Sequence, residues 1–323
     1  MTDIALNQID TNGISMRIAE AGSGPLVLLI HGWPESWYSW RHQITALAAA
    51  GFHAVAPDMR GYGGTSAPAA AEAYRIDHLA KDVIGIIDHF SQDTATIVGH
   101  DWGSMVVWYT ALFHPSRING VMGMSVPYGG RAKLPPLDSF KAAMGDNFFY
   151  ILYHNEAGGV AEAEYDADPR GILSRLYASP ASPRTPAKIT DPRRSAGGWI
   201  DRLGEVTAQP DWLSTEDLDY FVNEFTRSGF RGGVNYYRNF NSNWEITSEL
   251  DPVISMPAAF LSGAQDVVIQ GADETALRNM MAPVMADLRD ITLIDNMGHW
   301  IQQEAPEATN AAIIEFLHGL SLT

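Results

Sequence analysis

Hydrophobic residues occur with two different spacings along the chain. Short, almost continuous apolar runs lie at 25–30, 53–58, 94–99, 118–126, 254–263 and 290–295. The segments between them, such as 78–90, carry apolar residues three and four positions apart, which predicts amphipathic helices. Continuous apolar strands that alternate with helices favour a mostly parallel β-sheet with helices on both faces. The sequence therefore predicts an α/β fold.

Both ends of the chain carry their own signals. Two strand-like segments, 4–10 and 14–22, flank Thr11, Asn12 and Gly13, and an Asn-Gly step between strands strongly predicts a β-hairpin. Residues 306–320 have helical spacing. We expect an N-terminal hairpin and a C-terminal helix.

The alternation of strands and helices breaks between about Tyr128 and Asn243. This stretch contains proline-rich loops and many aromatic residues, and it shows no convincing strand pattern. The simplest interpretation is one α/β core, residues 1–127 and 246–323, interrupted by a mostly helical cap (lid) insertion at 128–245. No internal repeat or low-complexity tract is visible in the sequence.

Composition excludes several kinds of chemistry. The net charge of −17, with no dense cluster of lysine and arginine, argues against a nucleic-acid partner and disfavours an anionic substrate at long range. The chain has no cysteine, which excludes disulfides, thiolate nucleophiles and Cys-ligated zinc. No H-E-x-x-H or similar spacing occurs, and His78 and His89, eleven residues apart, suit a solvated helix face. We expect no metal and no cofactor.

The sequence also argues against a membrane partner. No run approaches the roughly 18 apolar residues of a membrane span. Residues 1–10 lack the basic flank and apolar centre of a signal peptide. We therefore expect a soluble, cytoplasmic protein, and the sequence leaves its oligomeric state open.

Asp101 occupies an unusual position after a predicted strand. The stretch Gly99-His100-Asp101-Trp102-Gly103 follows strand residues 94–98 and precedes the helical segment 104–113. This strand–turn–helix context, with flanking glycines that permit a tight backbone, is typical of a nucleophile elbow. The alternative is that Asp101 caps the helix, because aspartate is a good N-cap residue. On this stretch alone the two interpretations are equally supported.

Two later residues favour the nucleophile. Asp266 follows the apolar run 254–263, and His299 follows the last apolar run, so both are expected at the carboxyl edge of the sheet. A single loop aspartate or histidine is usually a solvated surface residue. Here, however, nucleophile, acid and histidine occur in the chain order known from one large hydrolase fold, and each follows a predicted strand.

The loop after the strand at 26–30 suggests an oxyanion hole. We expect the backbone N–H of Trp33 to converge with that of Trp102, the residue after the nucleophile, although an ordinary Gly-Pro turn is the alternative. The supporting motif residues are His31, Gly32, Pro34 and His100.

Taken together, these motifs resemble the α/β-hydrolase-fold epoxide hydrolases. The resemblance covers nearly the whole chain and rests on "HGWPESWYSWRHQ", "PDMRGYGGTSAP", "GHDWGSMVVWYTALFHP", "SGAQDVV" and "MGHW". It implies an aspartate nucleophile, a helical cap, a small hydrophobic epoxide as substrate, and water as the second reactant.

The resemblance also implies two cap tyrosines that hold the epoxide oxygen. The matching stretches are "NFFYILYHNEAGGVAEAE" and "SGFRGGVNYYRNF", which assign Tyr150 and Tyr237. An extra residue near Gly158 and Gly159 makes Tyr153 the alternative to Tyr150, and Tyr236 is the alternative to Tyr237. Without the motifs, each tyrosine would be interpreted as aromatic packing.

The residue type itself points to attack at a saturated carbon. A serine that attacked such a carbon would become a stable ether, whereas an aspartate becomes an ester that activated water can hydrolyse. A carboxylate is already ionised at neutral pH, and a tyrosine, with an ordinary pKa of about 10, stays protonated and can donate a proton to the leaving oxygen. His299, oriented by Asp266, would activate the water that cleaves the ester.

Two other classes of function share parts of this pattern. A haloalkane dehalogenase would use the same nucleophile, with Trp102 as a halide donor, but other halide and acid positions of such enzymes are filled here by Trp33 and "GMSVPY". Fluoroacetate-type enzymes carry arginines where this chain has Trp102 and Met105. A non-catalytic binding protein of the same fold is a further alternative, whereas an esterase is disfavoured because no G-x-S-x-G occurs.

Overall fold

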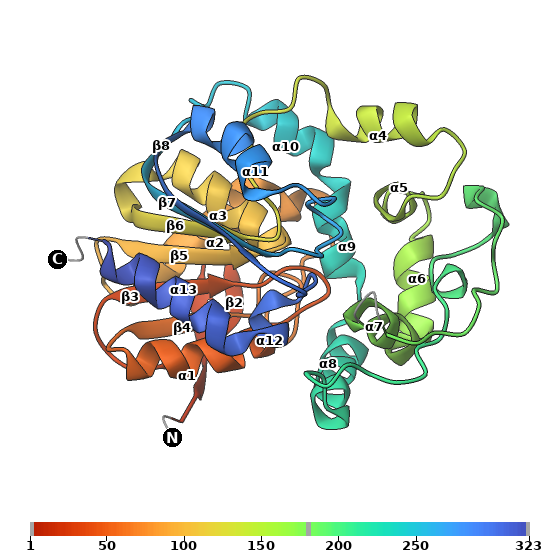
Figure 1. The fold of residues 1–323 in the computed structure, drawn as a ribbon, viewed down its shortest axis with the longest axis horizontal. Coiled ribbons are helices and arrows are strands. Elements are labelled where there is room, and N and C mark those ends of the chain that lie inside the picture. The colour runs from red at the N-terminus through yellow and green to blue at the C-terminus, as the bar shows by residue number, and fades with distance from the viewer. Residues whose placement is uncertain (1–2, 179–181, 321–323) are drawn as a thin grey trace.

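A computed structural model describes residues 3–178 and 182–320, and in these residues eight strands form one sheet. The order across the sheet is β1-β2-β4-β3-β5-β6-β7-β8 (Figure 1). The strands are β1 (Ala5–Thr11), β2 (Ile14–Ala21), β3 (Leu26–Ile30), β4 (His53–Pro57), β5 (Ala95–His100), β6 (Ile118–Met124), β7 (Ile254–Gly263) and β8 (Met285–Ile294).

The sheet is mostly parallel, as the sequence predicts. In the order across the sheet, β4-β3-β5-β6-β7-β8, all neighbouring strands are parallel. β1 pairs antiparallel with β2, and β2 pairs antiparallel with β4. The predicted hairpin is confirmed: Asn12 and Gly13 form the turn, and both have a positive φ. Asn and Gly tolerate this region better than other residues, which explains the strength of the signal.

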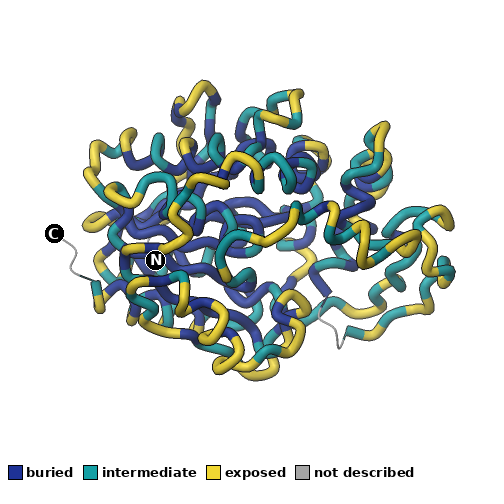
Figure 2. The backbone as a smooth tube through the Cα atoms, turned by 90° about the horizontal axis from the view of Figure 1, so that it is seen from above, coloured by how far each residue is buried: buried dark blue, intermediate teal, exposed yellow. Residues whose placement is uncertain are grey.

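Helices cover both faces of the sheet (Figure 1). One face packs against α2 (Ile76–His89), α3 (Trp102–Phe113) and α11 (Glu274–Met281), and the other against α1 (Arg41–Ala49), α12 (Ile301–Glu304) and α13 (Pro306–His318). Because β3 and β5 are central and covered on both sides, every one of their residues is buried. Figure 2 shows this interior as a buried band inside an exposed outer layer.

Among the described residues, the chain between β6 and β7 adds no strand to the sheet. Its helices are α4 (Pro136–Met144), α5 (Tyr150–His154), α6 (Val160–Ala167), α7 (Pro169–Tyr177), α8 (Thr215–Ser228), α9 (Arg231–Arg238) and α10 (Phe240–Ile246). We call Pro136–Ile246 the cap segment. Figure 1 shows α5, α6 and α7 at one end of the molecule, separated from the sheet by α9. Part of the proline-rich stretch, 179–181, lies outside the described residues.

None of the helices in the described part of the chain has both the length and the hydropathy needed to cross a membrane.

Candidate active site

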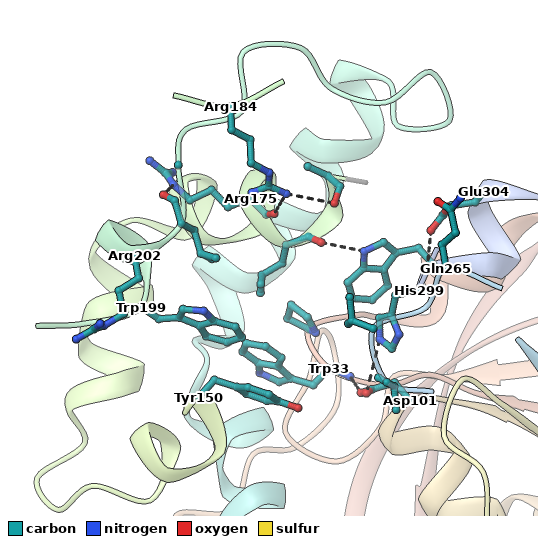
Figure 3. Close-up of a pocket in the computed structure, with 18 of the residues that line it drawn as sticks. Trp33, Asp101, Tyr150, Arg175, Arg184, Trp199, Arg202, Gln265, His299 and Glu304 are labelled. Carbon is teal, nitrogen blue, oxygen red and sulfur yellow. Dashed lines mark hydrogen bonds and ion pairs between the residues drawn. The ribbon is translucent and has the colours of Figure 1, made fainter. Parts of the chain in front are cut away.

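The backbone turns sharply at Asp101, between β5 and α3. Asp101 has φ 53° and ψ −117°, a conformation that non-glycine residues rarely adopt. Glycine is needed at positions 99 and 103 because backbone segments pack closely there. A Cβ on Gly99 would collide with the carbonyl oxygen of Gly103, and a Cβ on Gly103 would collide with the carbonyl oxygen of Ile30. The Asp101 side chain makes no hydrogen bond that caps α3 and instead lines a cavity (Figure 3). The helix-cap interpretation is therefore wrong.

His299 lies between the two predicted carboxylates. Its Nδ1 is 3.0 Å from Asp266 Oδ2, and its Nε2 is 3.7 Å from Asp101 Oδ2. Asp266 follows β7 and His299 follows β8, so the carboxyl ends of parallel strands bring together residues far apart in sequence. The backbone N–H of Val268 donates to Asp266 Oδ1 at 2.8 Å and helps to fix that carboxylate.

The charges of these three groups depend on one another. Burial alone would raise the pKa of Asp266, but the charge of His299 and its hydrogen bond lower it to about 2. Burial alone would lower the pKa of His299, but Asp266, and to a smaller extent Asp101, raise it to about 9. Burial raises the pKa of Asp101, and His299 and His100 oppose that effect. His299 is thus held as a cation while both carboxylates are charged.

Two backbone N–H groups favour the charged form of Asp101. The N–H of Trp33 donates to Asp101 Oδ1 at 2.8 Å, and the N–H groups of both Trp33 and Trp102 lower the pKa of this carboxyl. A Cβ on Gly32 would lie 2.5 Å from Asp101 Cβ, so only glycine allows this loop to approach. The two amides predicted for an oxyanion hole therefore both lie at Asp101.

The supporting motif residues hold this loop in place. His31 Nδ1 donates to the carbonyl oxygen of Gly32 at 2.8 Å, and its Nε2 accepts from the N–H of Met59 at 2.9 Å. His100 Nε2 is 2.8 Å from the carbonyl oxygen of His299. Pro34 lines the cavity next to Trp33.

Sequence reasoning missed Glu35, a completely buried carboxylate beneath the loop. It accepts hydrogen bonds from Gly32 N–H at 2.7 Å and Gln302 Nε2 at 2.8 Å, and its Oε2 lies 2.8 Å from His100 Nδ1. The available signal was an acidic residue inside the apolar, aromatic stretch "HGWPESWYSW". Such a residue requires internal partners if the stretch is buried.

Tyr150 and Tyr237 both line the cavity, whereas their alternatives do not. Figure 3 shows Tyr150 near Trp199 and Trp33. The rings of Tyr150 and Tyr237 approach edge to face, with centroids 5.8 Å apart. Burial, together with the nearby charge of Asp101, raises the pKa of both hydroxyls. The hydroxyl of Tyr153 instead donates to Val160 O at 3.4 Å, and that of Tyr236 to Arg60 O at 3.0 Å.

The cavity has a volume of about 490 Å³, which is typical of a site for a small molecule. Trp199 stacks on Tyr150 with ring centroids 4.9 Å apart, and Trp33 lies parallel to Trp199 at 5.9 Å. Aromatic side chains therefore form much of the cavity wall around Asp101 and His299. Trp102 is not among the described residues that line this cavity.

Comparisons with known proteins agree with this fold. A family model described as alpha/beta hydrolase fold matches residues 25–306. Epoxide hydrolase A of Mycobacterium tuberculosis is 45% identical over 97% of each chain, and Epoxide hydrolase 2 of Siraitia grosvenorii is 36% identical over 98% of this chain and 99% of its own. The crystal structure of Epoxide Hydrolase A from Mycobacterium thermoresistibile matches with a TM-score of 0.89 and 45% identity, covering 99% of this chain and 100% of the other.

The fold and the site define an α/β-hydrolase-fold protein. Within that class, relatives matched over nearly their whole length show that the chain belongs to the epoxide hydrolases. The predicted fold and the predicted family are both confirmed.

Proposed function

We propose that this chain converts epoxides to vicinal diols through a covalent ester on Asp101. The observation that carries the mechanism is the placement of Asp101, His299 and the hydroxyls of Tyr150 and Tyr237 around one cavity. A carboxylate nucleophile, a base and two proton donors are the groups that such a reaction needs.

The two oxygens of Asp101 have different roles in this proposal. Oδ1 accepts the N–H of Trp33, whereas Oδ2 faces His299. Oδ2 attacks an epoxide carbon, the carbon–oxygen bond of the ring breaks, and a tyrosine hydroxyl gives its proton to the departing oxygen. Burial keeps the tyrosines protonated, because it raises the pKa of Tyr150 and of Tyr237.

The second step removes the ester. Water, deprotonated by His299, attacks Cγ of Asp101, and the negative charge develops on Oδ1, next to the N–H groups of Trp33 and Trp102. One such donor contributes about 3 kcal/mol to the transition state. Collapse of this intermediate breaks the Cγ–Oδ2 bond, and the departing oxygen takes the proton that His299 had accepted from water. The regenerated Asp101 carboxyl loses its proton, which restores the tyrosine hydroxyl, and the diol leaves.

Ester formation also prepares His299 to act as a base. The charge of Asp101 is one of the causes that raise the pKa of His299 to about 9. An ester carries no charge, so alkylation of Asp101 removes this contribution and lowers the pKa of His299. The first step thereby favours the neutral imidazole that the second step requires.

The cavity walls support a hydrophobic epoxide as the substrate class, because Trp33, Trp199, Leu176 and Leu203 line it. Dehalogenation is not favoured. The indole of Trp102, the candidate halide donor, lies outside the described cavity lining, and the full-length relatives are named epoxide hydrolases.

A single turnover in oxygen-18 water, with enzyme in excess over styrene oxide, tests the covalent step. The first diol should be largely unlabelled because its new oxygen comes from Asp101, and the peptide that contains Asp101 should gain label during ester hydrolysis. A labelled first diol with an unlabelled peptide would mean that water adds to the epoxide directly.

A further inference from the structure

Tyr177, the last residue of α7 in the cap segment, donates its hydroxyl to a backbone carbonyl of the core. The acceptor is Pro34 O, at 2.5 Å, and both residues are buried. The direction of the bond is certain because a carbonyl oxygen can only accept. Among the described residues, this is the one hydrogen bond that joins the cap segment to the loop at 31–35.

The Pro34 carbonyl begins a chain of hydrogen bonds through the backbone of this loop. Its peptide unit also carries the N–H of Glu35, which donates to Gly32 O at 3.3 Å. The peptide unit of Gly32 O carries the N–H of Trp33, and this N–H donates to Asp101 Oδ1 at 2.8 Å. The chain therefore runs from a cap hydroxyl through two peptide units to a carboxylate oxygen.

The hydrogen bonds in such a chain strengthen one another. A donor at a carbonyl oxygen polarises the peptide unit, so that the N–H of the same unit becomes a better donor. Every bond of this chain points the same way, towards Oδ1 of Asp101. The hydroxyl of Tyr177 therefore strengthens the Trp33 N–H as a donor without touching the reacting atoms.

Contacts with the core fix Tyr177 at the head of this chain. Trp300 Nε1 donates to Leu176 O at 2.9 Å, and the ring of Trp300 meets the ring of Tyr177 edge to face, with centroids 4.7 Å apart. Burial, together with the nearby charge of Glu35, raises the pKa of Tyr177, so its hydroxyl keeps the proton that it donates.

We propose that Tyr177 is a positioning residue for the oxyanion hole, and this role rests on the proposed function. In ring opening Asp101 gives up its negative charge, so a strong donor at Oδ1 stabilises the starting carboxylate and does not assist this step. In ester hydrolysis negative charge develops on Oδ1, so the same donor lowers the barrier. Loss of the Tyr177 hydroxyl therefore affects the two steps differently, whereas general damage to the fold would slow both.

Tyr177→Phe tests this role, because it removes the hydroxyl and keeps most of the side-chain volume. Rapid-quench measurements with styrene oxide separate the rate of ester formation from the rate of ester hydrolysis. Hydrolysis should fall roughly threefold to tenfold, the effect of losing one neutral hydrogen bond. Ester formation should stay at or above the wild-type rate, so intact-protein mass spectrometry should detect more ester in the steady state.

Tyr128→Phe is the matched control. Tyr128 is also buried, and its hydroxyl also donates to a proline carbonyl, Pro252 O at 3.1 Å, but it neither lines the cavity nor belongs to the chain of hydrogen bonds. This variant should keep both rates. Replacement of Tyr177 alone by a fluorinated tyrosine is the converse test. Its more acidic hydroxyl is a stronger donor and leaves no carbonyl unpaired, so ester hydrolysis should become faster.

Two results with Tyr177→Phe would overturn this role and leave the proposed function standing: wild-type rates in both steps, or an equal loss in both. Ester hydrolysis that is not accelerated by the fluorinated tyrosine would overturn it as well. A wild-type enzyme that forms no ester would overturn the proposed function and this role together.

Discussion

At the scale of single residues, the candidate site places two buried tyrosine hydroxyls near the carboxylate of Asp101. Tyr150 and Tyr237 approach each other edge to face, and the charge of Asp101 helps to raise the pKa of each. A phenol in this setting resists ionisation, so in the proposed mechanism it is available as a donor when negative charge moves from Asp101 to the epoxide oxygen. In that step Asp101 loses its charge, so its contribution to the raised pKa values of both tyrosines disappears as the proton is transferred.

Removal of these donors should slow ring opening. Tyr150→Phe and Tyr237→Phe should each reduce the rate of enzyme alkylation, and the double variant should lose roughly 10² to 10⁴ in rate, the usual range for general acid catalysis. Rapid-quench measurement of the ester checks this. Phenylalanine keeps most of the packing volume, so thermal unfolding should change little. A double variant with wild-type alkylation would contradict the assignment.

His299 should be needed only for the second step. His299→Gln should therefore still react with the epoxide but fail to release it, and intact-protein mass spectrometry should detect a species heavier by the mass of the substrate. Asp266→Asn should show a milder form of the defect, because Asp266 orients His299 without contacting the ester. Asp101→Asn is the control and should form no adduct; an unmodified His299→Gln protein would show that His299 acts earlier.

At the scale of secondary structure, the two helices that carry the tyrosines are joined to each other. Arg238 Nε, on α9, donates to His154 O at the end of α5 at 3.1 Å, and Asn155 Nδ2 donates to Tyr237 O at 3.2 Å. Helix α9 also approaches the core closely: a Cβ on Gly232 would collide with the carbonyl oxygen of Gly61. The position of Tyr237 is therefore set by backbone contacts on both sides of its helix.

Gly232→Ala should displace α9 and with it the hydroxyl of Tyr237. We expect slower alkylation with little change in ester hydrolysis, because Asp266 and His299 lie on other elements. Gly319→Ala is the milder control, since its Cβ would lie 3.3 Å from Phe316 O, a close contact that a shift of a few tenths of an ångström relieves. Equal losses in both steps would indicate general damage to the fold rather than movement of one helix.

The strands and the placement of Asp101, Asp266 and His299 near one another were predictable because both depend on short-range patterns. Apolar runs located β3, β5 and β7, and the residues that follow parallel strands meet at one edge of the sheet, so the chain positions of Asp101, Asp266 and His299 sufficed.

The choice between adjacent side chains was not predictable in the same way. Helix phase decides that Tyr237 faces the cavity and Tyr236 faces Arg60, and the sequence supported this choice only through a family motif. The contacts of Glu35 with His100 and Gln302 join residues distant in sequence, which no local pattern encodes.

At the scale of the whole molecule, the reaction site lies where the cap segment meets the α/β core. Trp300 Nε1, from the core, donates to Leu176 O in the cap segment at 2.9 Å, and the hydroxyl of Tyr236 donates to Arg60 O at 3.0 Å. Arg41, on α1, pairs with Asp217, on α8, at 3.3 Å. Polar contacts between the cap segment and the core thus hold the cap tyrosines near Asp101.

The buried pair of Asp266 and His299 should also shape the stability of the whole molecule against pH. The pKa of Asp266 is lowered from 3.8 to about 2, so its contribution is present above pH 3.8 and is lost as the pH falls through 2. The pKa of His299 is raised from 6.5 to about 9, so its contribution is present below pH 6.5 and is lost as the pH rises through 9. Between pH 3.8 and 6.5 the pair contributes roughly 2 kcal/mol to the free energy of unfolding. Urea unfolding of the wild type and of Asp266→Asn, measured across this pH range, checks this. The difference in free energy of unfolding should be largest between pH 3.8 and 6.5 and should shrink at lower and at higher pH. A difference independent of pH would mean that the ionisation of this pair adds no stability.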